Sequence, residues 1–125
     1  MAKRKKAKKA AGKKKSSRKS RATAIEKLPK DAVTLMVVLR AREGQETLLE
    51  AEVRALVAPT RKEEGCLGYY LHRSADAPGM LLLHEVWSSR EAHTAHTHSP
   101  HFLRWNARKD ALLGSRDGTF WKQVV

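Results

Sequence analysis

The sequence predicts an α+β fold in which helices cover one face of a single antiparallel sheet. The first observation is the order of hydrophobic periodicities, which gives a strand, a helix, two strands, two helices and a last strand. The second is the turn Asp76-Ala77-Pro78-Gly79, whose residue types join two neighbouring strands as a hairpin. Together they indicate the ferredoxin-like split βαβ arrangement.

Aliphatic and β-branched residues mark the strands. Residues 33–39 are almost continuously apolar, which is typical of a strand buried on both faces. Residues 66–73 and 80–87 flank the hairpin turn, and residues 119–125 follow the turn Arg116-Asp117-Gly118 as the last strand. Helices on one face leave the other face of the sheet open. The aliphatic strands therefore predict that a second copy of the chain covers it in a homodimer.

The longest predicted helix covers residues 45–63. Its inward stripe consists of residues that recur at steps of three and four, namely Leu49, Val53, Leu56 and Thr60. Pro59 is expected to kink or loosen the last turn of this helix.

Two further helices are predicted from their first residues. The capping box Ser88-x-x-Glu91 begins a short helix that ends at about His96. The pair Ser99-Pro100 supplies an N-cap and a favourable first helical residue, and the helix continues to Leu113 and stops at Gly114.

The charge of the chain is concentrated at its beginning. The 125 residues carry a net charge of +13, and the first 30 hold 14 Lys and Arg against one acid. The sequence thus predicts a disordered basic tail over residues 1–30 and a neutral folded domain over residues 31–125. Lysine clusters without aromatics favour nonspecific binding of nucleic acid or another polyanion through residues 1–22. A solubilising extension is the alternative.

Neither a signal peptide nor a membrane span is evident. The longest apolar runs, at residues 35–39 and 80–83, are far shorter than the roughly 20 residues that cross a bilayer. Cys66 is the single cysteine, so an intramolecular disulfide is impossible, in agreement with a reducing compartment. We expect a cytoplasmic protein without membrane insertion.

Five motifs occur in a fixed order between residues 33 and 125. They are Thr60-Arg61-x-Glu63-x-Gly65-Cys66, Asp76-x-Pro78-Gly79, Glu85-x-Trp87, Glu91-Ala92-x-x-x-His96 and Ser99-Pro100-His101-Phe102. In this order they resemble the antibiotic biosynthesis monooxygenase superfamily. The resemblance implies a dimeric α+β barrel, in which two copies pair sheet to sheet. It also implies one of several activities, because anthrone and quinol monooxygenases of the family need no cofactor whereas other members degrade haem.

The spacing of the histidines raises the question of a metal. His93 and His96 are three residues apart, and His98 and His101 repeat this spacing, but Ser99-Pro100 places the two pairs on different helices. A metal site normally adds a carboxylate or thiolate from another element, and the sequence singles none out. We therefore expect no metal. Exposed or capping histidines, and one or two histidines in a pocket, both remain open.

The resemblance also addresses haem. Haem-degrading members place a tryptophan where this chain has His96 and their axial histidine where it has Asn106. Because neither residue matches, haem is not expected. What remains is oxygenation with O₂ as co-substrate and no cofactor. A deprotonated phenol can pass an electron to O₂ itself, so the protein need only exclude water, hold the ring and manage protons.

Trp87, His96 and His84 are the candidate catalytic residues. Trp87 ends a strand, where an indole can wall a pocket and donate its N–H. His96 can accept a proton near neutral pH, and His84 points into an interior from the middle of a strand. Each also has a structural interpretation: a core or interface tryptophan, a helix-end histidine bonded to backbone, and a core or dimer-interface histidine.

Further residues are candidates for contact with the substrate: Tyr70, Arg73, Leu83, His93 and His101. Leu83 departs from the family pattern, because anthrone oxygenases carry an asparagine at this position. The missing polar group favours a phenolic or quinol substrate over an anthrone. Glu85 is interpreted as a structural partner for a backbone or arginine group rather than as a base.

The sequence thus predicts a cofactor-independent monooxygenase that oxidises a quinol-like or phenolic aromatic with O₂. The alternative is a non-catalytic dimeric ligand-binding domain, tethered by its basic N-terminal tail to nucleic acid or another polyanion.

Overall fold

The computed structural model describes residues 28–125, and residues 31–124 form one compact unit. The predicted basic tail and its nucleic-acid binding fall almost wholly on residues 1–27, outside the described part of the chain. The elements of the unit are β1 (Val33–Ala41), α2 (Glu46–Arg61), β2 (Cys66–Arg73), β3 (Met80–Trp87), α3 (Arg90–His96), α4 (Pro100–Leu112) and β4 (Leu113–Trp121). None of the helices in this part is long and apolar enough to cross a membrane.

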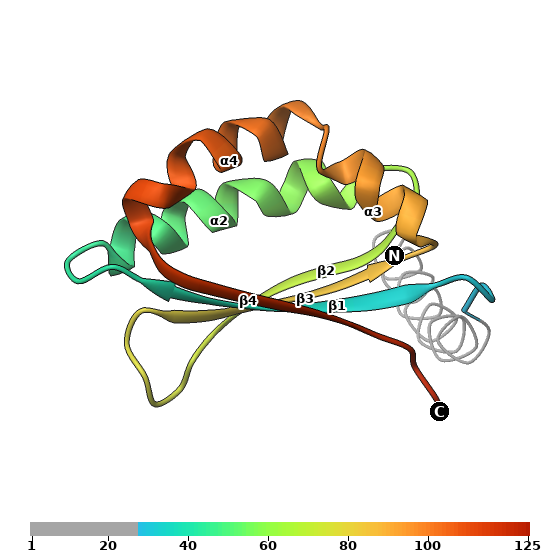
Figure 1. The fold of residues 1–125 in the computed structure, drawn as a ribbon, viewed down its shortest axis with the longest axis horizontal. Coiled ribbons are helices and arrows are strands. Elements are labelled where there is room, and N and C mark those ends of the chain that lie inside the picture. The colour runs from blue at the N-terminus through green and yellow to red at the C-terminus, as the bar shows by residue number, and fades with distance from the viewer. Residues whose placement is uncertain (1–27) are drawn as a thin grey trace, which may run out of the picture. The chain divides into compact units, whose positions relative to one another are not determined.

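The four strands form one antiparallel sheet in the order β2-β3-β1-β4. All three helices lie on one side of it, as Figure 1 shows. The predicted α+β, ferredoxin-like fold is therefore confirmed. The central strand β1 pairs with both β3 and β4, so Leu35 faces Glu85 on one side and Phe120 on the other.

The two faces of the sheet differ in burial. Odd-numbered residues of β1 and β3 face the helices and are buried, among them Leu35, Val37 and Leu83. Even-numbered residues such as Met36 and Leu82 lie on the other face, where they stay partly exposed. The hydrophobic core thus lies between the sheet and its helices, as strand periodicity requires.

Helix α2 follows the prediction closely. Its buried residues are Leu49, Val53, Leu56 and Thr60, which form the predicted stripe. Pro59 does not end the helix, which continues to Arg61. A proline near the end of a helix removes only one hydrogen bond, and packing of the buried stripe keeps the last turn in place.

The two shorter helices begin at serine caps. Ser99 Oγ accepts a hydrogen bond from the Phe102 N–H at 3.3 Å, as predicted for the start of α4. The predicted cap of α3 was wrong by one residue, because Ser89 rather than Ser88 accepts from the Ala92 N–H at 3.0 Å. Both serines are favourable N-cap residues, but only Ser88 has a glutamate three residues later, so the backbone conformation decides the cap and the capping-box pattern does not.

The last strand begins earlier than predicted. Gly114, expected to end α4, already belongs to β4, which stops at Trp121 and not at residue 125. The run Gly-Ser-Arg-Asp-Gly has poor strand propensity, but its pairing with β1 overrides that preference. As an edge strand, β4 tolerates polar residues that a central strand would not.

Candidate active site and histidine cluster

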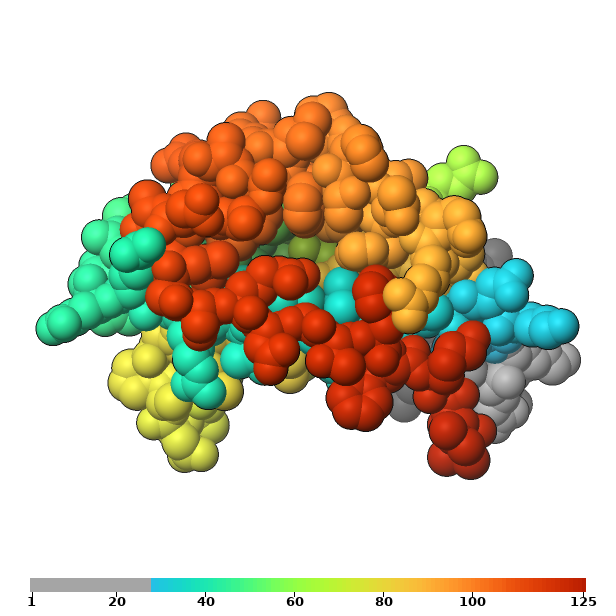
Figure 2. Space-filling model, in the orientation of Figure 1, coloured from blue at the N-terminus to red at the C-terminus, as the bar shows by residue number. Residues whose placement is uncertain are grey.

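A cavity of about 190 Å³ lies between α4, α2 and the helix-covered face of the sheet. Figure 2 shows the surface hollowed between α4 and β4, where deeper atoms are visible. Most of the wall is apolar and is formed by Val37, Leu39, Leu56, Tyr69, Leu83, Phe102 and Trp105. The polar groups of the lining are Glu85, Asn106, Lys109 and Arg116. An apolar chamber with a few convergent polar groups is the usual form of a small-molecule site.

Glu85 is the acidic group of this cavity. It lies on β3 on the same face as Leu83 and Trp87, and only 4% of it is exposed. Its Oε1 accepts a hydrogen bond from the Trp87 indole N–H at 3.0 Å. Burial raises the pKa of Glu85 to about 7, against the opposing effects of that hydrogen bond and of nearby Arg116. The carboxyl group can therefore take up or release a proton near neutral pH.

Trp87 supports Glu85 from within the core. The indole is fully buried, and its ring lies 4.8 Å from that of His96 and 5.8 Å from that of His93, between centroids. Tyr69 meets it edge-on at 6.5 Å. Trp87 is not part of the cavity lining itself. Its contribution is to fix the orientation of a carboxyl group that is.

His96 connects the aromatic cluster to a second carboxylate. Its side chain is 1% exposed, and its Nδ1 lies 2.6 Å from Glu63 Oε2. Burial lowers the pKa of His96, while the hydrogen bond to Glu63 acts in the opposite direction. With Nδ1 donating to the carboxylate, the neutral ring leaves Nε2 without a proton.

Glu63 accepts from a second imidazole as well. His101 Nε2 lies 2.7 Å from the same Oε2 atom and 3.1 Å from Ser99 Oγ. The possible ligand atoms of Glu63, His96 and His101 all lie within 4.8 Å of one another. These three residues are the group in residues 28–125 whose types and spacing suit a metal ion.

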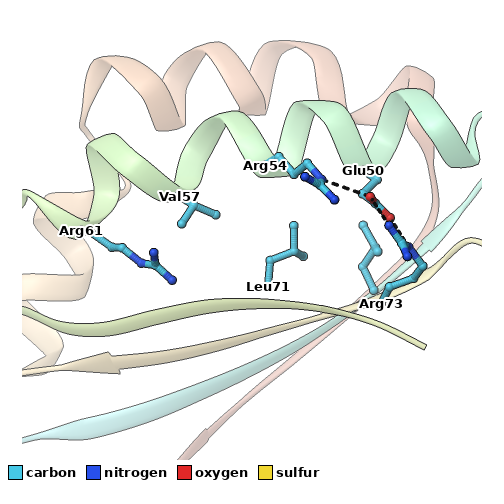
Figure 3. A pocket seen from close by; sticks show the side chains of 7 residues that line it. Glu50, Arg54, Val57, Arg61, Leu71 and Arg73 are labelled. Carbon is cyan, nitrogen blue, oxygen red and sulfur yellow. Dashed lines mark hydrogen bonds and ion pairs between the residues drawn. The ribbon is translucent and has the colours of Figure 1, made fainter. Parts of the chain in front are cut away.

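A larger hollow of about 520 Å³ opens between α2 and the edge strand β2. Figure 3 shows Glu50 with Arg54 and Arg73 at one end of it and Arg61 at the other. Arg73 holds Glu50 through two hydrogen bonds, of 2.6 and 2.7 Å. These contacts, led by the Arg73 hydrogen bond, hold the pKa of Glu50 at about 2. We call this hollow the arginine groove.

Comparison with known proteins assigns the fold to a family. Residues 32–108 match the family described as antibiotic biosynthesis monooxygenase. The chain belongs to this family. The protein Rv0793 of Mycobacterium tuberculosis is 38% identical over 81 residues, which are 65% of this chain and 79% of that one.

Two solved structures of similar chains agree with this assignment. PA3566 from Pseudomonas aeruginosa has a TM-score of 0.75 and 33% identity, covering 77% of this chain and 97% of its own. The structure of Rv0793 has a TM-score of 0.71 and 34% identity, covering 75% and 96%. The family predicted from the five motifs is thus confirmed.

The family fold brings some of the sequence-predicted site residues together. Leu83 lines the cavity, while His93 packs against Trp87 and Phe120. Burial lowers the pKa of His93 to about 4, so this imidazole is neutral at pH 7. Trp87, His96 and His101 lie in one continuous cluster with it.

Other residues predicted for the site lie elsewhere in the domain. Tyr70 and His84 pair across strands on the open face of the sheet, with ring centroids 5.5 Å apart. Burial and nearby His72 lower the pKa of His84. Arg73 lies in the arginine groove rather than in the cavity.

Two carboxyl groups that the sequence did not assign to the site lie among these residues, Glu85 in the cavity and Glu63 in the histidine cluster. For Glu85 a usable signal exists, because it shares the parity of Leu81, Leu83 and Trp87 on β3 and so must face the core. Glu63 offers no such signal. It follows a helix in a charged stretch, and only the fold brings it to His96, 33 residues away.

Proposed function

We propose that this protein is a cofactor-independent monooxygenase that oxidises a quinol-like or phenolic aromatic with O₂ in the cavity beneath α4. The observation that carries the proposal is Glu85, a buried carboxyl group in an apolar chamber with a pKa of about 7. A base with a pKa near the working pH combines a useful ionised fraction with adequate basicity.

The proposed reaction begins when the Glu85 carboxylate takes the proton of a phenolic O–H. The phenolate then passes one electron to O₂, and the resulting radical pair combines to form a C–O bond at a ring carbon that bears hydrogen. The peroxide takes up a proton, and the hydrogen on the same carbon leaves as a proton to the base. The electron pair of that C–H bond forms the C=O bond as the O–O bond breaks with loss of water. One oxygen atom stays on the carbon as a carbonyl, and the other leaves as water.

The remaining polar groups of the cavity suit the charges that develop. Lys109 and Arg116 provide positive charge for a phenolate or a peroxide, and Asn106 provides an amide. The apolar walls from Leu83, Phe102 and their neighbours exclude water and hold the ring. The indole N–H of Trp87 holds the Glu85 carboxyl group in its orientation by a hydrogen bond.

The size of the cavity supports a small substrate. Its 190 Å³ lies below the range of about 300–1,000 Å³ that is usual for drug-sized ligands. Leu83 adds an apolar side chain to this wall. Both features favour an aromatic of one or two rings over a three-ring anthrone.

We also propose that two copies of the chain pair through the open face of the sheet. Met36, Val38 and Leu82 are partly exposed on this face, and Trp121 at its edge is 56% exposed. Apolar surface of this kind favours a two-fold interface. Sedimentation should show a dimer that Val38→Lys weakens. Leu103→Lys, which changes an exposed leucine of α4, serves as the control.

Oxygen consumption by the metal-stripped, full-length protein tests the activity. A panel of hydroquinones and naphthols is supplied with ¹⁸O₂, and the product is analysed by mass spectrometry. The proposal expects one labelled oxygen atom per product molecule. Saturable binding of these compounds without oxygen uptake would contradict it and favour the ligand-binding alternative.

A further inference from the structure

We propose that Glu63, His96 and His101 form a binding site for a divalent transition-metal ion, separate from the cavity. The three side chains come from different elements. Glu63 lies in the turn after α2, His96 is the last residue of α3, and His101 lies in the first turn of α4.

The donor atoms already converge on one point. Glu63 Oε2 lies 2.6 Å from His96 Nδ1 and 2.7 Å from His101 Nε2, and all three atoms fall within 4.8 Å. Two imidazoles and one carboxylate are ligands that suit Zn²⁺, Co²⁺ and Fe²⁺, whereas Mg²⁺ and Ca²⁺ prefer oxygen donors alone. Three protein ligands leave one position for water.

Only a small movement is needed to admit an ion. With bonds of about 2.0–2.2 Å in a tetrahedral arrangement, neighbouring ligand atoms lie about 3.3–3.6 Å apart, so Glu63 must retract by somewhat less than 1 Å. Its side chain is 16% exposed, and the residue lies beyond the end of α2. The ring of His96 is held in place by Trp87 and Phe102, with centroids at 4.8 and 5.0 Å.

The ion would tie together the ends of three helices without entering the cavity. None of its three ligands lines the cavity. His96 nevertheless touches Phe102, which does line it, and Trp87, which holds Glu85. The ion therefore stabilises the wall of the chamber, and the proposed oxygenation does not depend on it.

The other histidines provide internal controls. His98 lies close in sequence to both proposed ligands, but its Nδ1 is 2.9 Å from the Thr94 carbonyl oxygen and it is not part of the cluster. Replacement of His98 changes the number of histidines without changing the proposed site.

The test is titration of the metal-stripped full-length protein with Co²⁺ and with Zn²⁺. Visible absorption and calorimetry measure binding, and thermal unfolding is recorded with and without ion. We expect one ion per chain and a rise in Tm. Glu63→Gln and His101→Ala should each weaken binding by at least about tenfold, the scale on which even outer groups affect metal sites. His98→Ala should bind like the wild type.

Each result decides the proposal. Because the rise in Tm is compared within each variant, a variant that is less stable without metal remains informative. Absence of saturable Co²⁺ and Zn²⁺ binding would overturn the site, and so would equal binding by wild type, Glu63→Gln and His101→Ala. Mg²⁺ binding of equal strength would show nonspecific attraction of a divalent cation to the carboxylate and would also overturn it. Oxygen uptake by the stripped protein is measured separately, so the site and the oxygenase proposal can fail independently.

Discussion

The cavity and the arginine groove each contain a glutamate, and the two carboxyl groups behave in opposite ways. Glu85 is buried with an indole as its hydrogen-bond partner, and its pKa is raised to about 7. Glu50 lies at an open groove beside Arg73 and Arg54, and its pKa falls to about 2. Desolvation dominates in the first case and guanidinium hydrogen bonds in the second.

This difference shows that the volume of a pocket alone does not identify the candidate active site. The arginine groove is larger, at about 520 Å³ against 190 Å³, but its carboxylate is ionised at neutral pH and held by arginines. Only the smaller cavity contains a group that can exchange a proton near pH 7. Perturbed pKa values of this kind cluster at functional sites.

The largest expected effect is on catalysis by a Glu85→Gln variant. The amide keeps the size of the side chain but cannot accept the phenolic proton, so kcat/KM should fall by about 10²–10⁴-fold. Glu50→Gln is the matched control and should retain wild-type activity. The measurement is oxygen uptake with an active phenolic substrate. Similar losses in both variants would remove the distinction between the two regions.

The second largest effect is expected on how the stability of the wild type and of Glu85→Gln depends on pH. The unfolded chain releases the Glu85 proton at about pH 4.5, whereas the folded chain retains it up to about pH 7. The folded state therefore binds more protons in this window, and its stability relative to Glu85→Gln should fall as pH rises. The loss approaches about 3 kcal/mol. Urea unfolding of both proteins at pH 4.5, 6 and 8 measures it, and a constant difference would contradict the assignment.

A smaller effect is expected from Trp87→Phe. This change keeps an aromatic ring but removes the N–H that lowers the pKa of Glu85. The pKa of Glu85 should rise further, so the rising limb of the pH–rate profile should shift to higher pH. The expected shift is about one pH unit, which is the scale of one hydrogen bond to a charged group. A profile that moves to lower pH would show that the indole does not stabilise the carboxylate.

The sequence predicted most of the fold because its elements have strong local signals. The stripe of α2, the hairpin turn and the Ser99-Pro100 start of α4 each depend on residues close together in the chain. The start of β4 could not be predicted in this way, because pairing with β1 determines it. A strand of low propensity forms there for tertiary reasons.

The site was predictable only where it followed strand parity. Trp87 and Leu83 were predicted as site residues, and in the structure both lie on the helix-covered face of β3. The position of Glu85 on the same face follows from strand alternation. The meeting of Glu63 with His96 and His101 depends on how the ends of three helices pack. Residues that far apart in sequence carry no local sign of their contact, so the structure was needed to find the cluster.

The smallest expected effect belongs to the arginine groove and sharpens the contrast with the cavity. Glu50→Gln removes the carboxylate charge that holds Arg73 and Arg54. Because these arginines are largely exposed, unfolding free energy should fall by at most about 1 kcal/mol. Salt screens exposed pairs, so the loss should shrink at high ionic strength, whereas the effect of Glu85→Gln should persist. Urea unfolding at low and high NaCl compares them, and a large salt-independent loss in Glu50→Gln would mean that the groove is covered by another surface in solution.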